Sequence, residues 1–109
     1  KVLHLSNTIC INSDFRSAIS QLHQESFDCI YFDGHHNKEA TLAYFNLLIS
    51  KAHNNSVFIF DDIYWSRDMT QAWETILKDS RVIVSIDCFN LGFIFFRKEQ
   101  PKQHFRIRL

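Results

Sequence analysis

The sequence predicts an α/β fold with a mostly parallel sheet, and three observations predict it. Two short apolar runs, residues 27–33 and 57–61, each stop abruptly at aspartate, which is typical of buried strands that reach a sheet edge. A helical pattern separates these runs, so we expect two parallel strands joined by a crossover helix. Two later runs, 81–86 and 91–97, are separated by only four residues, which is too few for a parallel crossover and predicts an antiparallel hairpin.

The first half of the chain alternates between strand and helix. Residues 8–12 form a short apolar run that we interpret as a strand, and Ser13 can cap the helix that follows. After the acid-tipped strand 27–33, Asn37 can cap a second helix, whose apolar residues recur at helical spacing to about Ala52. These units predict helices that cross between neighbouring parallel strands.

The second half contains the clearest helical pattern of the chain, after a predicted cap at Ser66. Its apolar residues fall at positions i, i+3, i+4, i+7 and i+8, namely Met69, Ala72, Trp73, Ile76 and Leu77. The basic tail from Lys98 ends in a short predicted strand, 104–109, and we interpret its charges as solvated. The full order is β-α-β-α-β-α-β-β, which predicts one domain over residues 1–109 with helices on both faces of the sheet.

Composition excludes several classes of function. The 12 basic and 12 acidic residues cancel, which argues against a nucleic-acid partner because such binding needs a basic face. No apolar run approaches the roughly 20 residues of a membrane span, so no membrane partner is expected. Cys10 and Cys29 lie in apolar runs without CxxC spacing, which predicts reduced thiols in the core and a cytoplasmic location. Because the chain begins at Lys1 and its only methionine is Met69, we expect it to be part of a longer protein.

Two phrases of the sequence resemble signatures of a known family. Residues 27–40, FDCIYFDGHHNKEA, resemble the "fDlifiDGxHxyea" phrase of a subgroup of small-molecule O-methyltransferases, and residues 57–63, VFIFDDI, resemble its following "vivfDDi" phrase. Together with the closing antiparallel hairpin, they resemble the C-terminal half of a class I S-adenosylmethionine-dependent methyltransferase. The resemblance implies a Rossmann-like three-layer sandwich, S-adenosylmethionine as cofactor and the hydroxyl of a small molecule as methyl acceptor.

The chain also departs from this family in one respect. The family approaches its cofactor with a glycine-rich loop, whereas this chain contains only Gly34 and Gly92. We interpret this as the loss of the first two β-α units. The resemblance therefore implies methyl transfer by the intact parent and an inactive isolated chain. Without those units a sheet edge would be exposed, which predicts a homodimer through that edge.

The acid-tipped strands predict a site at the carboxyl edge of the sheet, where open α/β sheets bind ligands. Neighbouring strands lie about 4.8 Å apart, so the carboxylates of Asp33, Asp61 and Asp62 can share one ion. The resemblance implies that these three residues bind Mg²⁺ or another divalent cation and that Asp33 takes part in catalysis. Alternatively, Asp61 caps the following turn, and Asp62 is solvated or pairs with Arg67.

Three further residues are candidates for the same site. His36 could act as a general base because the pKa of histidine lies near neutrality, or it could orient Asp33 or cap the next helix. Tyr64 and Trp65 follow Asp61 and Asp62 and could line a pocket for the methyl acceptor. The alternative is that these aromatic residues pack onto the helix that begins at Ser66.

Two other functions remain open from the sequence. A metal-dependent phosphoesterase could use Asp33, Asp61 and Asp62 together with His35 and His36 to hold two ions. A non-catalytic fragment or dimerisation module would explain the missing cofactor loop. Nucleotide hydrolysis of the P-loop type is disfavoured because the chain has no GxxxxGK[ST] motif.

Overall fold

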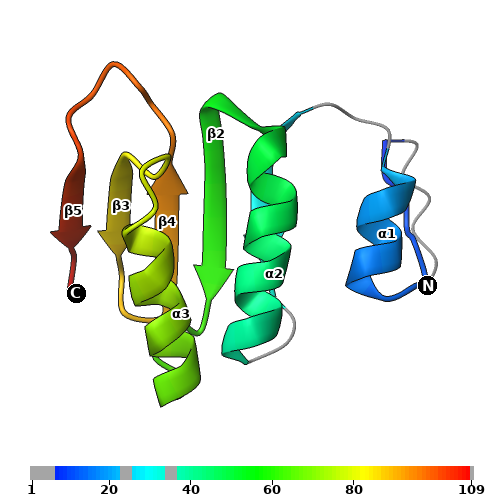
Figure 1. The fold of residues 1–109 in the computed structure, drawn as a ribbon, viewed down its shortest axis with the longest axis horizontal. Coiled ribbons are helices and arrows are strands. Elements are labelled where there is room, and N and C mark those ends of the chain that lie inside the picture. The colour runs from blue at the N-terminus through cyan, green and yellow to red at the C-terminus, as the bar shows by residue number, and fades with distance from the viewer. Residues whose placement is uncertain (1–6, 23–25, 34–36, 109) are drawn as a thin grey trace.

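The computed structural model describes residues 7–22, 26–33 and 37–108, and Figure 1 shows their arrangement. The elements in chain order are α1 (Phe15–Gln21), β1 (Phe27–Phe32), α2 (Lys38–Leu48), the 3-10 turn η1 (Ile49–Lys51), β2 (Ala52–Asp61), α3 (Arg67–Leu77), β3 (Val84–Asp87), β4 (Leu91–Phe95) and β5 (Gln103–Arg106). The five strands form one sheet in the order β1-β2-β4-β3-β5.

The sheet is mostly parallel, with one antiparallel strand inside it. β1 pairs with β2 in parallel, and β3 pairs with β5 in parallel. β4 is antiparallel to both of its neighbours, and Gly92 lies between Phe60 of β2 and Asp87 of β3. The predicted hairpin is thus confirmed, and its second strand inserts next to β2. This mixed α/β arrangement is compatible with a Rossmann-like fold.

The helices begin where local sequence satisfies their first backbone amides. The Asn37 side chain accepts a hydrogen bond from the Ala40 amide at 2.8 Å, and the Ser66 hydroxyl accepts one from the Met69 amide at 3.2 Å. Both predicted caps are confirmed. α2 and α3 pack side by side over one face of the sheet, while α1 lies beyond α2 (Figure 1).

Alternate residues of the strands form the core beneath these helices. Phe58, Phe60 and Ile94 are at most 1% exposed. The Phe58 ring meets the Phe45 ring of α2 edge-on at 6.3 Å and the Phe96 ring at 4.8 Å, in the edge-to-face geometry that aromatic pairs favour. Phe32, Phe45, Phe58, Phe60 and Phe96 thus form an aromatic layer between the sheet and the helices.

The other face of the sheet carries apolar residues without a helix over them in the described part of the chain. One row across the strands consists of Tyr31, Ile59, Phe93, Ile86 and Phe105. Tyr31 is 52% exposed and Phe105 is 45% exposed. The described residues thus form two layers, and the third layer that the sequence predicted is not among them.

The N-terminal prediction was wrong in two places. Residues 8–12 form no strand in the structure and are exposed, because no neighbouring strand among the described residues pairs with them. The cap of α1 is Asp14 and not Ser13, since the Asp14 carboxylate accepts a hydrogen bond from the Ser17 amide at 2.7 Å.

The basic tail is also less solvated than predicted. The Lys102 ammonium donates to the backbone carbonyls of Asp79 and Val82, each at 2.9 Å, and the Arg108 guanidinium reaches the Asp87 carboxylate at 3.1 Å. These bonds hold β5 against β3. Two of the tail's cations therefore serve the fold.

Stability is expected to depend on pH through His104. Its Nδ1 lies 2.7 Å from the hydroxyl of the buried Ser85, and partial desolvation holds the pKa of His104 below its usual value despite the opposing charge of Asp87. A depressed pKa contributes stability above the unfolded-state value of about 6.5 and loses it as pH falls through the folded-state pKa. Urea unfolding at pH 7.5 and pH 5 should show a larger loss for the wild type than for His104→Gln. Equal losses would contradict this role.

Candidate functional site

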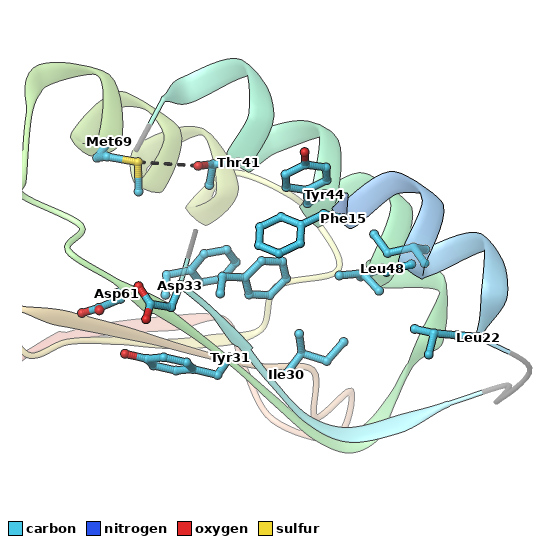
Figure 2. Close-up of a pocket in the computed structure, with 14 residues that line it drawn as sticks. Phe15, Leu22, Ile30, Tyr31, Asp33, Thr41, Tyr44, Leu48, Asp61 and Met69 are labelled. Atoms are coloured by element: carbon cyan, nitrogen blue, oxygen red, sulfur yellow. Dashed lines mark hydrogen bonds between the residues drawn. The ribbon is translucent and has the colours of Figure 1, made fainter. Parts of the chain in front are cut away.

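The candidate site lies at the carboxyl edge of the sheet, where β1, β2 and β3 all end at or next to an aspartate. Asp33 follows β1, Asp61 ends β2 and Asp87 ends β3. Asp33 and Asp61 line the same cavity of about 230 Å³, and Figure 2 shows their carboxylates side by side. The predicted meeting of these two residues is thus found in the structure.

The cavity extends from this pair of carboxylates between α1, α2 and β1. Its walls are mainly apolar and aromatic and include Phe15, Ile19, Leu22, Ile30, Tyr44 and Leu48. The Phe15 and Tyr44 rings meet edge-on at 5.2 Å, and the Thr41 hydroxyl lies 3.5 Å from the Met69 sulfur. An apolar chamber with acid at one end suits a ligand that joins a flat or aliphatic body to a polar or cationic group.

Tyr31 reports how close the acids lie to one another. Interaction of its hydroxyl with the nearby Asp61 carboxylate is the main cause that raises the pKa of Tyr31. Desolvation and the negative charges of Asp61, Asp33 and Asp62 raise the pKa further. The three predicted aspartates therefore act on one phenol at the sheet edge.

The predicted metal site is not supported by this geometry. Within residues 7–22, 26–33 and 37–108, no three His, Cys, Asp or Glu side chains are arranged to hold one ion. One reason is that Asp62 does not line the cavity with Asp33 and Asp61. His36, the predicted base, lies outside the described residues, as does His35.

Tyr64 and Trp65 do not line the cavity with Asp33 and Asp61. The Tyr64 hydroxyl instead donates a hydrogen bond to the Asp87 carboxylate, and its ring stacks on Phe89 at a centroid distance of 5.6 Å. Trp65 is 66% exposed at the same edge of the sheet. The predicted acceptor pocket is therefore not assembled around these two aromatic residues in the described chain.

Asp87 is the residue of this edge that the sequence analysis did not select. Its side chain is 1% exposed, and its carboxylate accepts hydrogen bonds from the Tyr64 hydroxyl, the Phe89 amide at 2.9 Å and Arg108 at 3.1 Å. Burial opposes its ionisation, but these bonds outweigh burial and lower the pKa of Asp87. The available signal was that a third apolar run also ends at aspartate.

No helix in the described part of the chain has the length and apolar character needed to cross a bilayer.

Comparison with protein families gives a match, and it covers both acid-tipped strands. A family model described as a methyltransferase domain matches residues 4–63, which is 60 of the 109 residues and includes β1, α2, β2 and the acid pair. Searches of curated proteins and of solved structures give no significant match. Since the matched span exceeds half of the sequence, this chain belongs to the methyltransferase-domain family.

Proposed function

We propose that this chain is part of an S-adenosylmethionine-dependent methyltransferase that acts on a hydroxyl of a small molecule. Family membership supports methyl transfer, and one structural observation supports the carboxyl edge of the sheet as its site. Asp33 and Asp61 lie together at one end of an otherwise apolar cavity, on the sheet edge where α/β folds bind ligands (Figure 2).

The charge and the apolar lining of the cavity support this choice of cofactor. When bound, S-adenosylmethionine supplies an electrophilic methyl group on a positively charged sulfur. The carboxylates of Asp33 and Asp61 would face that charge, and the rings of Phe15 and Tyr44 offer apolar surface to a heterocycle. No glycine-rich loop exists in the chain, so the remaining cofactor contacts are proposed to come from the rest of a longer protein.

The same carboxylates can act on the acceptor. A carboxylate at hydrogen-bond distance would orient the acceptor hydroxyl and take its proton as the oxygen accepts the methyl group. Asp33 is the proposed base of the pair, since Asp61 also interacts with the Tyr31 hydroxyl. His36 remains a proposed base beside it. Assistance by Mg²⁺ is a further proposal, and the described residues contain no group of three side chains that could hold the ion.

The first test is calorimetric titration of S-adenosylmethionine, whose positive sulfur the two carboxylates would face, into the folded chain with and without Mg²⁺. We expect micromolar binding by the wild type and a loss of about tenfold or more in Asp61→Asn, because this substitution removes one of the two negative charges that would face the sulfur. Asp28→Asn is the matched control, because Asp28 is an exposed aspartate at the opposite end of β1. Equal binding by Asp61→Asn and Asp28→Asn would contradict a role for the cavity.

A non-catalytic role is the second candidate, and the free edge of β1 favours it. β1 has β2 on one side and no described strand on the other. We propose that copies of the chain associate through this edge into a homodimer. Light scattering over a range of concentrations should then show dimers, and a constant monomer mass would rule this out. A phosphoesterase is less well supported, because the described residues provide no group that could hold even one metal ion.

A cytoplasmic location remains a proposal from the cysteines. Cys10, Cys29 and Cys88 are free thiols, but Cys10 and Cys29 are exposed, so their predicted place in the core was wrong.

A further inference from the structure

Two segments with a strained backbone position lie next to each other at the carboxyl edge of the sheet, one after β2 and the other after β3. In the described part of the chain, Asp62 with a φ of 55° and Phe89 with a φ of 70° are the non-glycine residues in the left-handed region. This region is uncommon for aspartate and unfavourable for a bulky residue such as phenylalanine. The two segments are joined directly, since the Asp62 amide donates a hydrogen bond to the Asn90 carbonyl at 2.8 Å.

One buried carboxylate bonds to both segments. Asp87 accepts a hydrogen bond from the Phe89 amide at 2.9 Å, within the turn that follows β3. It also accepts one from the hydroxyl of Tyr64, which lies two residues after Asp62 in the loop that follows β2. The Asp87 side chain is 1% exposed, so these bonds form out of contact with solvent.

Arg108 completes the arrangement from the far end of the chain. Its guanidinium donates to the Asp87 carboxylate and to the Asp87 carbonyl, each at 3.1 Å. It also lies 5.4 Å from the centre of the Phe89 ring and 6.0 Å from that of Tyr64, within the range of cation–π attraction. A buried carboxylate is costly unless it is paired, and here the pairing cation comes from the segment after β5.

We propose that Asp87 is a positioning residue for Asp61 and Asp62. Its hydrogen bonds to Tyr64 and Phe89 fix the loop after β2. That loop in turn sets the position of Asp61 and Asp62 at the sheet edge. The inference rests on the proposed function for its catalytic meaning. Asp87 itself does not line the cavity and is assigned no contact with cofactor or acceptor.

The test is residue-resolved amide hydrogen exchange by NMR on Asp87→Asn. This variant keeps the size of the side chain but has one acceptor oxygen where the wild type uses two. We expect the Asp62 and Phe89 amides to exchange about tenfold faster, while the Phe58 and Ile94 amides of the core keep their rates. No change at Asp62, or an equal rise at core amides, would overturn the proposal.

Asp79→Asn is the matched control. Asp79 is also a carboxylate of lowered pKa bonded to arginine and to a backbone amide, but it lies at the amino end of β3. The Asp79→Asn variant should leave the exchange rate of the Asp62 amide unchanged. If Asp87→Asn does not fold, Tyr64→Phe removes only the hydroxyl from the Asp87 carboxylate and should raise the exchange rate at Asp62 in the same direction; an unchanged rate would overturn the proposal.

A second measurement separates this inference from the proposed function. Titration of S-adenosylmethionine should show weaker binding by Asp87→Asn, by about threefold or more, and unchanged binding by Asp79→Asn. A folded wild type that binds no S-adenosylmethionine would refute cofactor binding by this chain, while the exchange data would still decide whether Asp87 fixes Asp61 and Asp62. Unchanged affinity with faster exchange at Asp62 would overturn the link to the site.

Discussion

Gly92→Ala is expected to lower the free energy of unfolding by about 3 kcal/mol, the upper part of the range for overpacked cores. The reason is the Trp73 ring of α3, which lies directly on the β4 backbone. A Cβ at position 92 would stand 2.4 Å from Trp73 Cη2 and 2.5 Å from Cζ3, far inside van der Waals contact. Trp73 is itself 2% exposed, so the ring has little room to move away. Urea unfolding followed by circular dichroism would measure the loss.

A double-mutant cycle identifies the cause. Trp73→Leu removes the ring that meets the added methyl group, so Gly92→Ala should cost much less in the Trp73→Leu background than in the wild type. Additive losses would show that the cost arises from the β4 backbone and not from the helix above it.

Phe58→Ala is expected to cost about 3–5 kcal/mol, the range for a large buried aromatic side chain. Phe58 is 0% exposed and contacts aromatic rings on three elements or segments: Phe32 of β1 at 5.4 Å, Phe45 of α2 at 6.3 Å and Phe96 after β4 at 4.8 Å. Its removal would leave a cavity where the sheet and α2 meet. The same unfolding assay gives the value.

Ile59→Ala is the matched control for Phe58→Ala. Ile59 is the next residue of β2 and points to the opposite face of the sheet, which no described helix covers. We expect a cost of about 1 kcal/mol, because the shortened side chain was only partly buried. A loss at Ile59 as large as that at Phe58 would mean that the second face is covered in solution.

The fold was predictable where local signals agreed with tertiary ones. The caps at Asn37 and Ser66 and the acid-tipped strands each combine a helix or strand pattern with a clear stop, and each is found in the structure. The sequence alone predicts a strand from residue 57, after a helix that stops at Asn54 and Asn55, since asparagine tolerates the left-handed conformation at a helix end. β2 begins at Ala52, because that residue pairs with Phe27 across a bulge and the Asn54 side chain bonds to Glu99 at 2.8 Å. These long-range partners override the local preference for a helix end.

The candidate site was predictable in part for the same reason. The rule that parallel strands end at one edge was sufficient to bring Asp33 and Asp61 together. It could not identify the bonds of Asp87, because its partners Tyr64 and Arg108 lie 23 and 21 residues away along the chain. Nor could it foresee that Asp61 would act on the Tyr31 hydroxyl, since a tyrosine on a strand gives no sign of which neighbour it meets.

The position of β4 inside the sheet has a consequence for folding during synthesis on the ribosome. Residues 57–61 of β2 pair with residues 91–95, so β2 stays an unpaired edge on that side until β4 has left the ribosome. The contacts of the central sheet are therefore long-range in sequence, and such pairings form slowly. Folding of this domain would be completed only after nearly all of it is synthesised, and a nascent chain that stalls before residue 91 would expose Phe58 and Phe60 beside an open strand edge, a species prone to aggregation.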